Sequence, residues 1–342
     1  MQRVRFGKTG LMVSAVAFGG IPILRLPVED AVRVVRRSIE LGINFIDTAN
    51  GYADSEEKLG IAIKGIPRDE LVITSKSIVR TKREFIEHVD LSLKRMGLEY
   101  IDIYQLHHVS SAKGYDAVFG EGGAFEGLQE VIRAGKVRHP AFSSHNVEIA
   151  MKIMREGKFS AVQLPFNYVD DLAASQAIPL ARELDMGFLS MKPMGGGLLS
   201  DAGLSFRYLS QFADIVPDPG IEKVEEIEEI VGIVNKGAEF SAEDAVRVER
   251  IKAELGDNWC HRCEYCMPCP ENIAISTVLN VRSLFGRMTF ERTLSMAGKA
   301  MEAARNCNGC RACVELCPYD LDIPRLIEDR LEIWKGYVAD NS

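Results

Sequence analysis

Four polar residues in the first third of the chain carry side chains suited to proton transfer: Asp47, Tyr52, Lys76 and His107. Each lies at or just beyond the end of a short apolar run. A cation beside a phenol favours the phenolate, so Lys76 near Tyr52 would lower the pKa of the phenol. Asp47 would neutralise the lysine, and His107 could hydrogen-bond a carbonyl oxygen beside the phenol. Such a set could protonate an oxygen while a hydride reaches the adjacent carbon.

Each of these residues, taken alone, also has a purely structural interpretation. Asp47 could cap a loop and Tyr52 could cover the rim of a sheet. Lys76 could be solvated, and His107 could be hydrogen-bonded inside a core. Only a fold that brings the four side chains together favours the catalytic interpretation. The carboxyl ends of parallel strands in a β/α barrel are such a place, because they meet on one face.

Eight apolar runs with the character of buried strands alternate with segments of helical periodicity. The runs are Ser14–Phe18, Ile43–Asp47, Leu71–Lys76, Ile101–His107, Val137–Ser143, Ala161–Phe166, Gly187–Met194 and Asp214–Val216. Strands that are apolar throughout are expected when helices cover a parallel sheet. Eight such units in about 240 residues predict a (β/α)8 TIM barrel, with residues 3–13 forming a hairpin across its bottom. An open doubly wound sheet is the alternative, but no Gly-x-Gly-x-x-Gly follows the first strand.

The composition indicates a globular protein, and the length favours two domains. The chain has 342 residues, of which 46% are hydrophobic and 26% charged, and a formal net charge of −8. A negative charge without basic clusters argues against nucleic acid as a partner. No apolar run is long enough for a membrane span, and the first residues lack the apolar core of a signal peptide. A cytoplasmic location is therefore expected.

All eight cysteines follow Asn258 and form two runs, C-x-x-C-x-x-C-x-x-C-P and C-x-x-C-x-x-C-x-x-x-C-P. They are Cys260, Cys263, Cys266 and Cys269, then Cys307, Cys310, Cys313 and Cys317. Three thiolates at i, i+3 and i+6 can wrap one face of an iron–sulfur cubane, while the fourth, before a proline, reaches away. Zinc is the alternative, but zinc sites usually show two separated Cys-x-x-Cys pairs.

The contexts NFIDTANGY, VITSK and IYQLH resemble the catalytic tetrad of the aldo-keto reductase family, in that family's order and strand positions. The resemblance implies that Tyr52 is the proton donor. It implies that Lys76 and Asp47 tune the phenol and that His107 orients the carbonyl of the substrate. His108 is the competing histidine, but the resemblance and the position at a strand end favour His107.

The same resemblance, which covers Arg3 to Val234, implies a nicotinamide cofactor across the mouth of the barrel. It assigns Ser143, Ser144, Asn146, Gln163 and Asn167 to the carboxamide region, Met191, Lys192, Pro193 and Gly195 to the nicotinamide and pyrophosphate, and Gly220, Glu222 and Lys223 to the adenosine end. Backbone amides at the start of the eighth helix are expected to be available there. Met191 replaces the aromatic residue that many members stack on the nicotinamide, although a thioether can pack there too. Glu222 stands where NADP-using members carry a basic residue, and a carboxylate would repel a 2′-phosphate. NADP(H) is the family default, and NAD(H) stays an open alternative.

The C-terminal part is similar to the helical dicluster ferredoxin module, so the whole chain resembles the iron–sulfur-containing branch of the aldo-keto reductases. We expect the barrel over residues 1–240. Over residues 241–342 we expect a helical linker and a mainly α-helical ferredoxin-like domain with two 4Fe–4S clusters. In such ferredoxins the fourth cysteine of a run ligates the other cluster. The resemblance thus implies one cluster on Cys260, Cys263, Cys266 and Cys317, and one on Cys307, Cys310, Cys313 and Cys269, although the two-residue final gap of the first run departs from the compact bacterial pattern.

The expected activity is NAD(P)H-dependent reduction of an aldehyde or ketone to an alcohol, or the reverse. The alternative is an iron–sulfur electron-transfer protein whose barrel docks a partner or binds a small molecule, and a third interpretation makes the clusters structural. A hydride carries two electrons and each cluster takes one, and the sequence shows no flavin motif that would convert between them. Two oxidised clusters would bring the formal charge to about −12, which would attract a basic redox partner protein.

Overall fold

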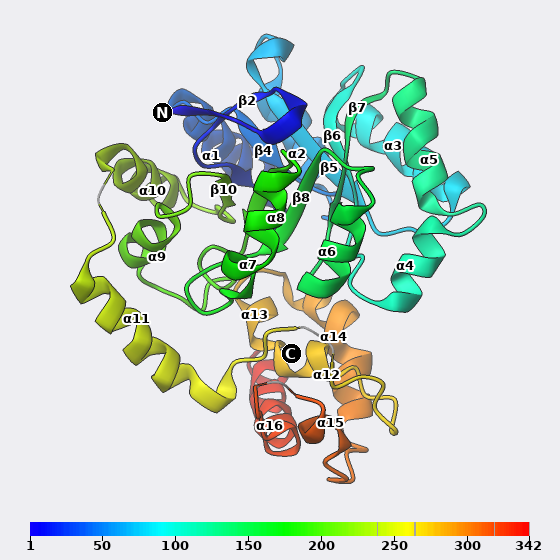
Figure 1. Ribbon diagram of the computed structural model, residues 1–342, viewed down its shortest axis with the longest axis vertical. Helices are drawn as coiled ribbons and strands as arrows, with labels where there is room; N and C mark the ends of the chain where they lie inside the picture. Colours follow the sequence, from blue (N-terminus) through cyan, green and yellow to red (C-terminus); the bar gives the residue numbers. More distant parts are fainter. Residues whose placement is uncertain (238, 263–264, 318, 342) are drawn as a thin grey trace. The chain divides into compact units, whose positions relative to one another are not determined.

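The structure is a computed structural model that describes residues 1–237, 239–262, 265–317 and 319–341 (Figure 1). Cys263, one of the predicted cluster ligands, lies outside these ranges. The contacts within the chain divide it into two compact units, residues 1–244 and residues 245–342.

The first unit is built on eight parallel strands that follow one another in chain order, from β3 to β10. Their bounds are β3 (Phe18–Gly19), β4 (Phe45–Asp47), β5 (Val72–Ser77), β6 (Ile101–Leu106), β7 (Val137–Ser143), β8 (Ala161–Pro165), β9 (Gly187–Met191) and β10 (Ile215–Asp218). The first strand meets the last: the Gly19 amide donates to the Pro219 carbonyl at 2.9 Å, and a parallel bridge joins Gly19 to Gly220. The sheet is thereby a (β/α)8 barrel, as predicted.

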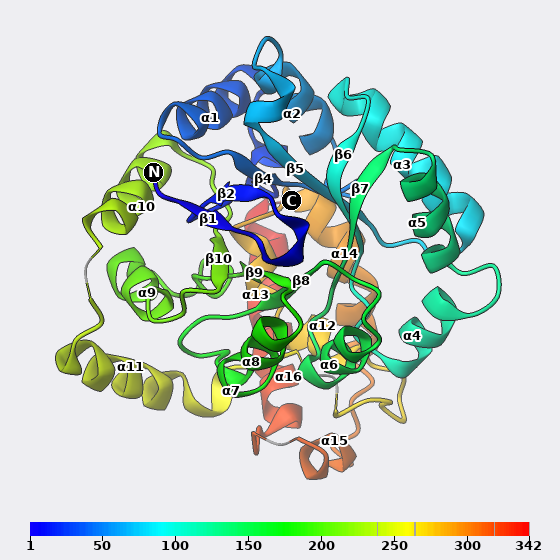
Figure 2. The ribbon, with the colours of Figure 1, turned by 45° about the horizontal axis from the view of Figure 1, so that its top comes forward.

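Helices surround the ring of strands (Figure 2). They are α1 (Val28–Glu40), α2 (Ser55–Ile63), α3 (Lys82–Met96), α4 (Ala112–Phe119), α5 (Ala124–Arg133), α6 (Val147–Arg155), α7 (Leu172–Ser175), α8 (Ala177–Glu183), α9 (Ala202–Leu209) and α10 (Val224–Lys236), with 3-10 turns η1 (Gly7–Thr9), η2 (Pro22–Arg25) and η3 (Arg68–Glu70). Helix α3 shows how local sequence sets these bounds. The Thr81 hydroxyl accepts from the Glu84 amide at its start, and Gly97, at φ 66°, ends it in the left-handed conformation that glycine adopts at little cost.

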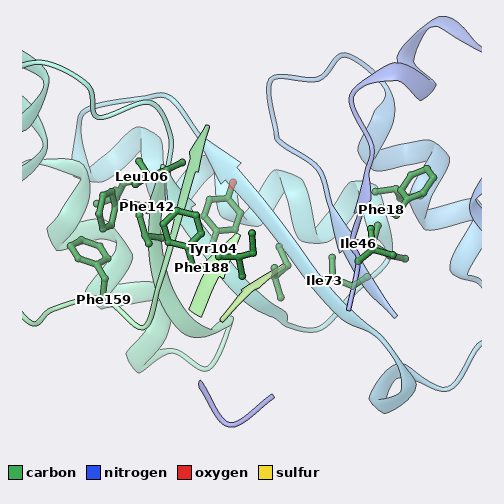
Figure 3. Packing of buried hydrophobic residues seen from close by; sticks show 14 of the residues in the cluster. Phe18, Ile46, Ile73, Tyr104, Leu106, Phe142, Phe159 and Phe188 are labelled. Carbon is green, nitrogen blue, oxygen red and sulfur yellow. The ribbon is translucent and has the colours of Figure 1, made fainter. Parts of the chain in front are cut away.

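The strands present alternate side chains to the helices and to the inside of the barrel. The outer layer packs against the helices and includes large apolar side chains such as Phe18, Ile46, Ile73, Tyr104, Leu106, Phe142, Phe159 and Phe188 (Figure 3). The inner layer at the lower end is a second apolar cluster, formed by Phe45, Val72, Ile103, Ala141, Ala161, Leu189 and Val216. Burial of these two layers against water is the main force that holds the barrel together.

A hairpin closes the lower end of the barrel, as the sequence predicts. Strands β1 (Arg3–Arg5) and β2 (Met12–Ser14) pair antiparallel, and Phe6 and Val13 join the inner apolar cluster. Figure 2 shows the hairpin, in dark blue, lying across the middle of the ring of strands. With this end plugged by apolar side chains, only the carboxyl ends of the strands are left for polar chemistry.

Several strand predictions are wrong in their bounds. The predicted seventh strand, Gly187–Met194, is too long, since β9 ends at Met191. The predicted first strand, Ser14–Phe18, is divided, since Ser14 belongs to the hairpin and the barrel strand is Phe18–Gly19. The predicted last strand ended at Val216, but β10 continues through Pro217 to Asp218. Pro217 is tolerated inside this strand even though it has no amide hydrogen, and its carbonyl still accepts from the Ala17 amide at 2.8 Å.

The second unit is helical. Helix α11 (Ala242–Leu255) leads into it and is followed by the 3-10 turn η4 (Gly256–Asn258), α12 (Ile275–Leu279), α13 (Arg282–Phe285), α14 (Phe290–Ala304), α15 (Ala312–Glu315) and α16 (Ile323–Asn341). Helices α12, α13 and α14 pack against α16. Throughout the part of the chain that the structure describes, no helix has both the length and the apolar character that a bilayer crossing requires.

Candidate active site

A layer of polar side chains lies above the apolar plug, inside the barrel. In most strands, the inward-facing residue two positions after the apolar residue of the plug is polar. The inward polar residues are Asp47, Thr74, Lys76, Gln105, Ser143, Gln163 and Asp218, all of them buried. Burying so many polar groups is costly unless they bond to one another. The polar layer is therefore costly in folding free energy, which is typical of a functional site.

Lys76 and Asp47 form a buried ion pair in the centre of this layer, with 2% and 4% of their side chains exposed. The lysine Nζ also donates to the Thr48 carbonyl at 2.8 Å. Burial by itself lowers the pKa of Lys76, but the attraction of Asp47, with smaller contributions from Tyr52 and Asp218, outweighs it and raises the pKa above its ordinary value. Lys76 is therefore a fixed cation at the base of the site.

Tyr52 comes from the loop between β4 and α2. A tight turn places it, in which the Tyr52 amide donates to the Ala49 carbonyl and the Ser55 amide donates to the Tyr52 carbonyl, at 3.0 and 2.9 Å. The Lys76 Nζ lies 5.1 Å from the centroid of the Tyr52 ring. The His107 ring meets it edge-on, with 6.1 Å between the ring centroids. The structure thus brings together the four residues that the sequence predicts as catalytic.

His107 is neutral in this setting. Burial lowers the pKa of its imidazole well below the ordinary value, and the positive charge of Lys76 lowers it further. A neutral imidazole can donate one N–H to a carbonyl oxygen. His108, the competing histidine, turns elsewhere: its ring lies 4.8 Å from that of His145, and its amide donates to the Ser143 hydroxyl at 2.9 Å.

The side-chain oxygen of Gln163, at the centre of the site, accepts no hydrogen bond from the described residues. Gln163 Nε2 donates to Asp218 Oδ2 at 2.9 Å and lies 3.5 Å from Asp47 Oδ2. Its Oε1 is buried, and no hydrogen-bond partner for it occurs among the described residues. A buried acceptor without a donor is costly. The amide nitrogen of a nicotinamide carboxamide would satisfy it, so this residue fits the predicted cofactor.

The other predicted carboxamide residues mainly organise their own loops. The Ser144 hydroxyl donates to the Asn146 carbonyl at 2.9 Å, and Asn146 Oδ1 accepts from the Ile149 amide at the start of α6. Asn167 Oδ1 accepts from the amides of Val169 and Asp170, both at 2.8 Å. These contacts give the loops after β7 and β8 a fixed shape.

The loop after β9 contains the predicted nicotinamide and pyrophosphate residues Met191, Lys192, Pro193 and Gly195. Lys192 has a positive φ of 57°, an uncommon conformation for a residue with a side chain. The loop is tied down at this point, since the Lys192 carbonyl accepts from Asn167 Nδ2 and from the Gly195 amide, at 3.0 and 2.9 Å. The Lys192 Nζ lies 2.8 Å from His145 Nε2. The loops after β7, β8 and β9 are thereby joined.

The predicted adenosine end differs from expectation in two ways. The amides of Glu222 and Lys223 were expected to be available to a cofactor, but both donate to the carboxylate of Glu226, at 2.8 and 3.0 Å. The carboxylate of Glu222 forms an ion pair with Arg25 from the turn η2, and both side chains are partly buried. The sequence analysis missed Arg25, which adds a cation from a distant segment that pairs directly with Glu222.

Asp218 is the second residue that the sequence analysis missed. Its carboxyl group is buried beside Asp47 and Gln163. A signal for it was present, because Val216 points into the barrel and the alternation of a strand places Asp218 on the same side.

Four cysteines gather in the second unit. The thiolates of Cys269, Cys307 and Cys310 lie near enough to Cys313 to raise its pKa, to which burial contributes most. The same four cysteines line one cavity. Among the residues that the structure describes, no three metal-binding side chains are close enough to hold a single ion. Four cysteine side chains around one cavity are the number of ligands that one 4Fe–4S cluster takes.

Comparison with known families matches this geometry. The model of the aldo/keto reductase family covers residues 15–213, more than half of the chain. This chain belongs to the aldo/keto reductase family. The model of the 4Fe-4S dicluster domain matches residues 259–322, so this reductase-family barrel is joined to a 4Fe-4S dicluster domain.

Named relatives of this family member cover its barrel. L-galactose dehydrogenase of Arabidopsis thaliana is 31% identical over 216 residues, which are 58% of this chain and 66% of that protein. "Probable aldo-keto reductase 1" of Glycine max is 26% identical over 222 residues, which are 60% of this chain and 62% of that protein. The chain thus spans less than two thirds of the length of these relatives.

Solved structures of the family share the fold. Aldo-keto reductase AKR11C1 of Bacillus halodurans superposes with a TM-score of 0.64 at 21% identity, over 73% of this chain and 96% of that one. An aldo-keto reductase of Klebsiella pneumoniae in complex with NADPH has a TM-score of 0.62 at 20% identity, over 73% and 95% of the two chains. At this level of identity the likeness shows the fold alone.

Proposed function

We propose that this aldo/keto reductase family member catalyses the nicotinamide-dependent reduction of an aldehyde or ketone to an alcohol, or the reverse reaction. One observation carries the proposal, namely the gathering of Asp47, Tyr52, Lys76 and His107 at the carboxyl ends of the first barrel strands. Family membership supports an oxidoreductase.

The four residues have separate roles in the proposed reaction. Tyr52 donates its phenolic proton to the carbonyl oxygen, and Lys76 stabilises the negative charge that remains on the phenol. Asp47 holds Lys76 in place and keeps the buried cation paired. His107, neutral because of burial, donates an N–H to the same carbonyl oxygen and orients it.

Bound NADP(H) or NAD(H) would supply or accept the hydride. Gln163 would hold the carboxamide through its open Oε1, together with the loop that contains Ser143, Ser144 and Asn146. Met191 would pack against the ring. The remaining proposed cofactor residues are Asn167, Lys192, Pro193, Gly195, Gly220, Glu222 and Lys223. The NADPH complex of the Klebsiella pneumoniae relative supports this class of cofactor.

We also propose two 4Fe–4S clusters in residues 241–342, each with four cysteine ligands. The grouping of Cys269 with Cys307, Cys310 and Cys313 supports exchange of the fourth ligand between the two runs. Cys260, Cys263, Cys266 and Cys317 would then hold the other cluster. The net negative charge of the chain favours a basic redox partner protein.

A second candidate function, electron transfer with the barrel as a docking or small-molecule module, is favoured by the match to a dicluster domain. Tyr52→Phe separates the two functions, because it removes one hydroxyl and leaves the shape of the ring. Holoenzyme prepared without oxygen would be assayed for aldehyde and ketone reduction with NADPH and NADH, for cofactor binding and for reduction of the clusters.

We expect Tyr52→Phe to lose at least about a thousandfold in kcat while the Kd of the cofactor changes less than about threefold. Tyr115→Phe is the matched control, since this tyrosine bonds to Glu156 at the outside of the barrel and should keep full activity. Equal turnover in wild type and Tyr52→Phe would rule out Tyr52 as the proton donor, and a wild type that reduces no aldehyde or ketone would rule out the reductase proposal. Reduction of the clusters that continues in Tyr52→Phe would then favour electron transfer.

A further inference from the structure

Asp218 adds a second buried carboxyl group to the Lys76–Asp47 ion pair. It ends β10, and 7% of its surface is exposed. Gln163 Nε2 donates to its Oδ2 at 2.9 Å and lies 3.5 Å from Asp47 Oδ2, so both carboxyl groups meet the same amide nitrogen. Its Oδ1 accepts a hydrogen bond from none of the described residues. The proposed reaction assigns no role to this group.

Two buried carboxyl groups beside the same amide nitrogen favour a proton between them, because two carboxylates would repel one another and have no hydrogen to share. Burial raises the pKa of Asp218 well above its ordinary value, and the negative charge of Asp47 raises it further, although Lys76 and Gln163 act in the opposite direction. The lack of a donor to Asp218 Oδ1 is consistent with a hydrogen on that oxygen, which would then be donated to Asp47.

The surroundings of Asp218 contain few other charges. Its titratable neighbours are Asp47 on β4 and Lys76 on β5, with the Tyr52 phenol beyond the lysine. On one side, Asp218 pairs with Met191 of β9. On the other side it lies next to Gly19 of β3, because a Cβ added to Gly19 would lie 3.1 Å from Asp218 Oδ1. Neither titrates. The proton on Asp218 thus decides whether the buried set is neutral or carries one net negative charge.

We infer that Asp218 is a positioning residue that keeps a proton at neutral pH and donates it in a hydrogen bond to Asp47, so that the two carboxyl groups together carry a single negative charge against Lys76. This inference rests on the proposed function for its consequence. With one negative charge opposite Lys76, the lysine keeps its pull on the Tyr52 phenolate. A second negative charge would weaken that pull and make Tyr52 a poorer acid.

Infrared spectroscopy tests the proton directly and needs no substrate. Holoenzyme labelled with 13C-aspartate should show, in D2O at neutral pD, the C=O band of a protonated aspartic acid, and Asp218→Asn should lose that band. Asp185→Asn is the matched control, since this exposed carboxylate pairs with Arg5 and its replacement should leave the band unchanged. A wild-type spectrum without a protonated aspartate band would overturn the inference, whether or not the variants fold.

Kinetics then test the consequence. Asp218→Asn keeps a neutral donor toward Asp47 and should stay within about threefold of wild type in kcat. Asp218→Val keeps the charge of the set but removes the hydrogen bond that positions Asp47 against Lys76, so it should lose about tenfold in kcat with the Kd of NADPH unchanged. A tenfold rise in that Kd for Asp218→Asn would make Asp218 a direct cofactor ligand and overturn the inference. If wild type reduces no carbonyl compound while the infrared band is present and depends on Asp218, the proposed function fails and the shared proton stands.

Discussion

Replacement of Lys76 by Met removes the buried cation and keeps a side chain of similar length. The Lys76 Nζ lies 5.1 Å from the centroid of the Tyr52 ring. At an effective dielectric constant of about 20, unit charges about 5 Å apart attract one another by roughly 3 kcal/mol. This attraction acts only after the phenol has given up its proton, so it stabilises the transition state and not the ground state. Removal of Lys76 should therefore lower kcat about 250-fold.

The variant also leaves Asp47 without its partner. Breaking a buried ion pair in this way costs about 3–5 kcal/mol of unfolding free energy, which could be mistaken for a catalytic defect. The double variant Asp47→Asn/Lys76→Met removes both charges, so it should recover most of the stability and none of the rate. Lys82→Met is the matched control, because Lys82 pairs with Glu130 where both side chains are exposed.

Single-turnover reduction of an aldehyde by NADPH, measured without oxygen at saturating cofactor, gives the rate of the chemical step. Thermal unfolding of the same holoenzyme preparations gives the stability. The reasoning would be refuted by a loss of less than about tenfold in Lys76→Met, or by a double variant that regains the wild-type rate along with the stability.

Three further predictions follow from the same geometry. Glu222→Gln should lower the Kd of NADPH about tenfold and leave the Kd of NADH nearly unchanged. The substitution removes a carboxylate and frees Arg25 to bind a 2′-phosphate. Equal changes in the two Kd values would contradict this prediction. Because the pKa of His107 is depressed, the folded enzyme keeps it neutral as the pH falls through about 6.5, so kcat should show no step there. Stability should decline below that pH, since only the unfolded chain takes up the proton, and it should decline less in His107→Gln. Cys269→Ala and Cys317→Ala should each halve the iron content of about eight atoms per chain, and zinc in place of iron in the wild type would contradict the cluster assignment.

The barrel and the meeting of three of the four predicted catalytic residues could be predicted for one reason, with Tyr52, in the loop after β4, as the exception. Asp47, Lys76 and His107 each close an apolar run, and parallel strands in a barrel end on the same face. The position of each residue in its own strand was therefore enough to place it in space. The bounds of several strands were wrong. Strand β3 has two residues and gives almost no local signal, and the predicted run Gly187–Met194 continues past the end of β9 into its loop.

Asp218 and Arg25 could not be predicted in the same way. Asp218 lies between Pro217 and Pro219, a pattern that indicates a loop, and its place in the barrel wall comes from its pairing with β9 and from the bonds of Pro217 and Pro219 to the amides of Ala17 and Gly19. Arg25 meets Glu222 across 197 positions of sequence, and no periodicity connects residues so far apart. The contact of Glu226 with the amides before α10 did have a local signal, because an acidic residue three positions into a helix often reaches back to its start.

The central claim is that Tyr52 protonates a carbonyl oxygen while a hydride from nicotinamide reaches the adjacent carbon. The most direct measurement uses NADPH carrying deuterium at the transferable position, with an accepted aldehyde and the anaerobic holoenzyme, and locates the deuterium in the alcohol. The account predicts one deuterium on the carbinol carbon in wild type, with no product from Tyr52→Phe under the same conditions. Alcohol that forms without deuterium, its hydrogen drawn from water, would show that the electrons travel another route and would contradict the account.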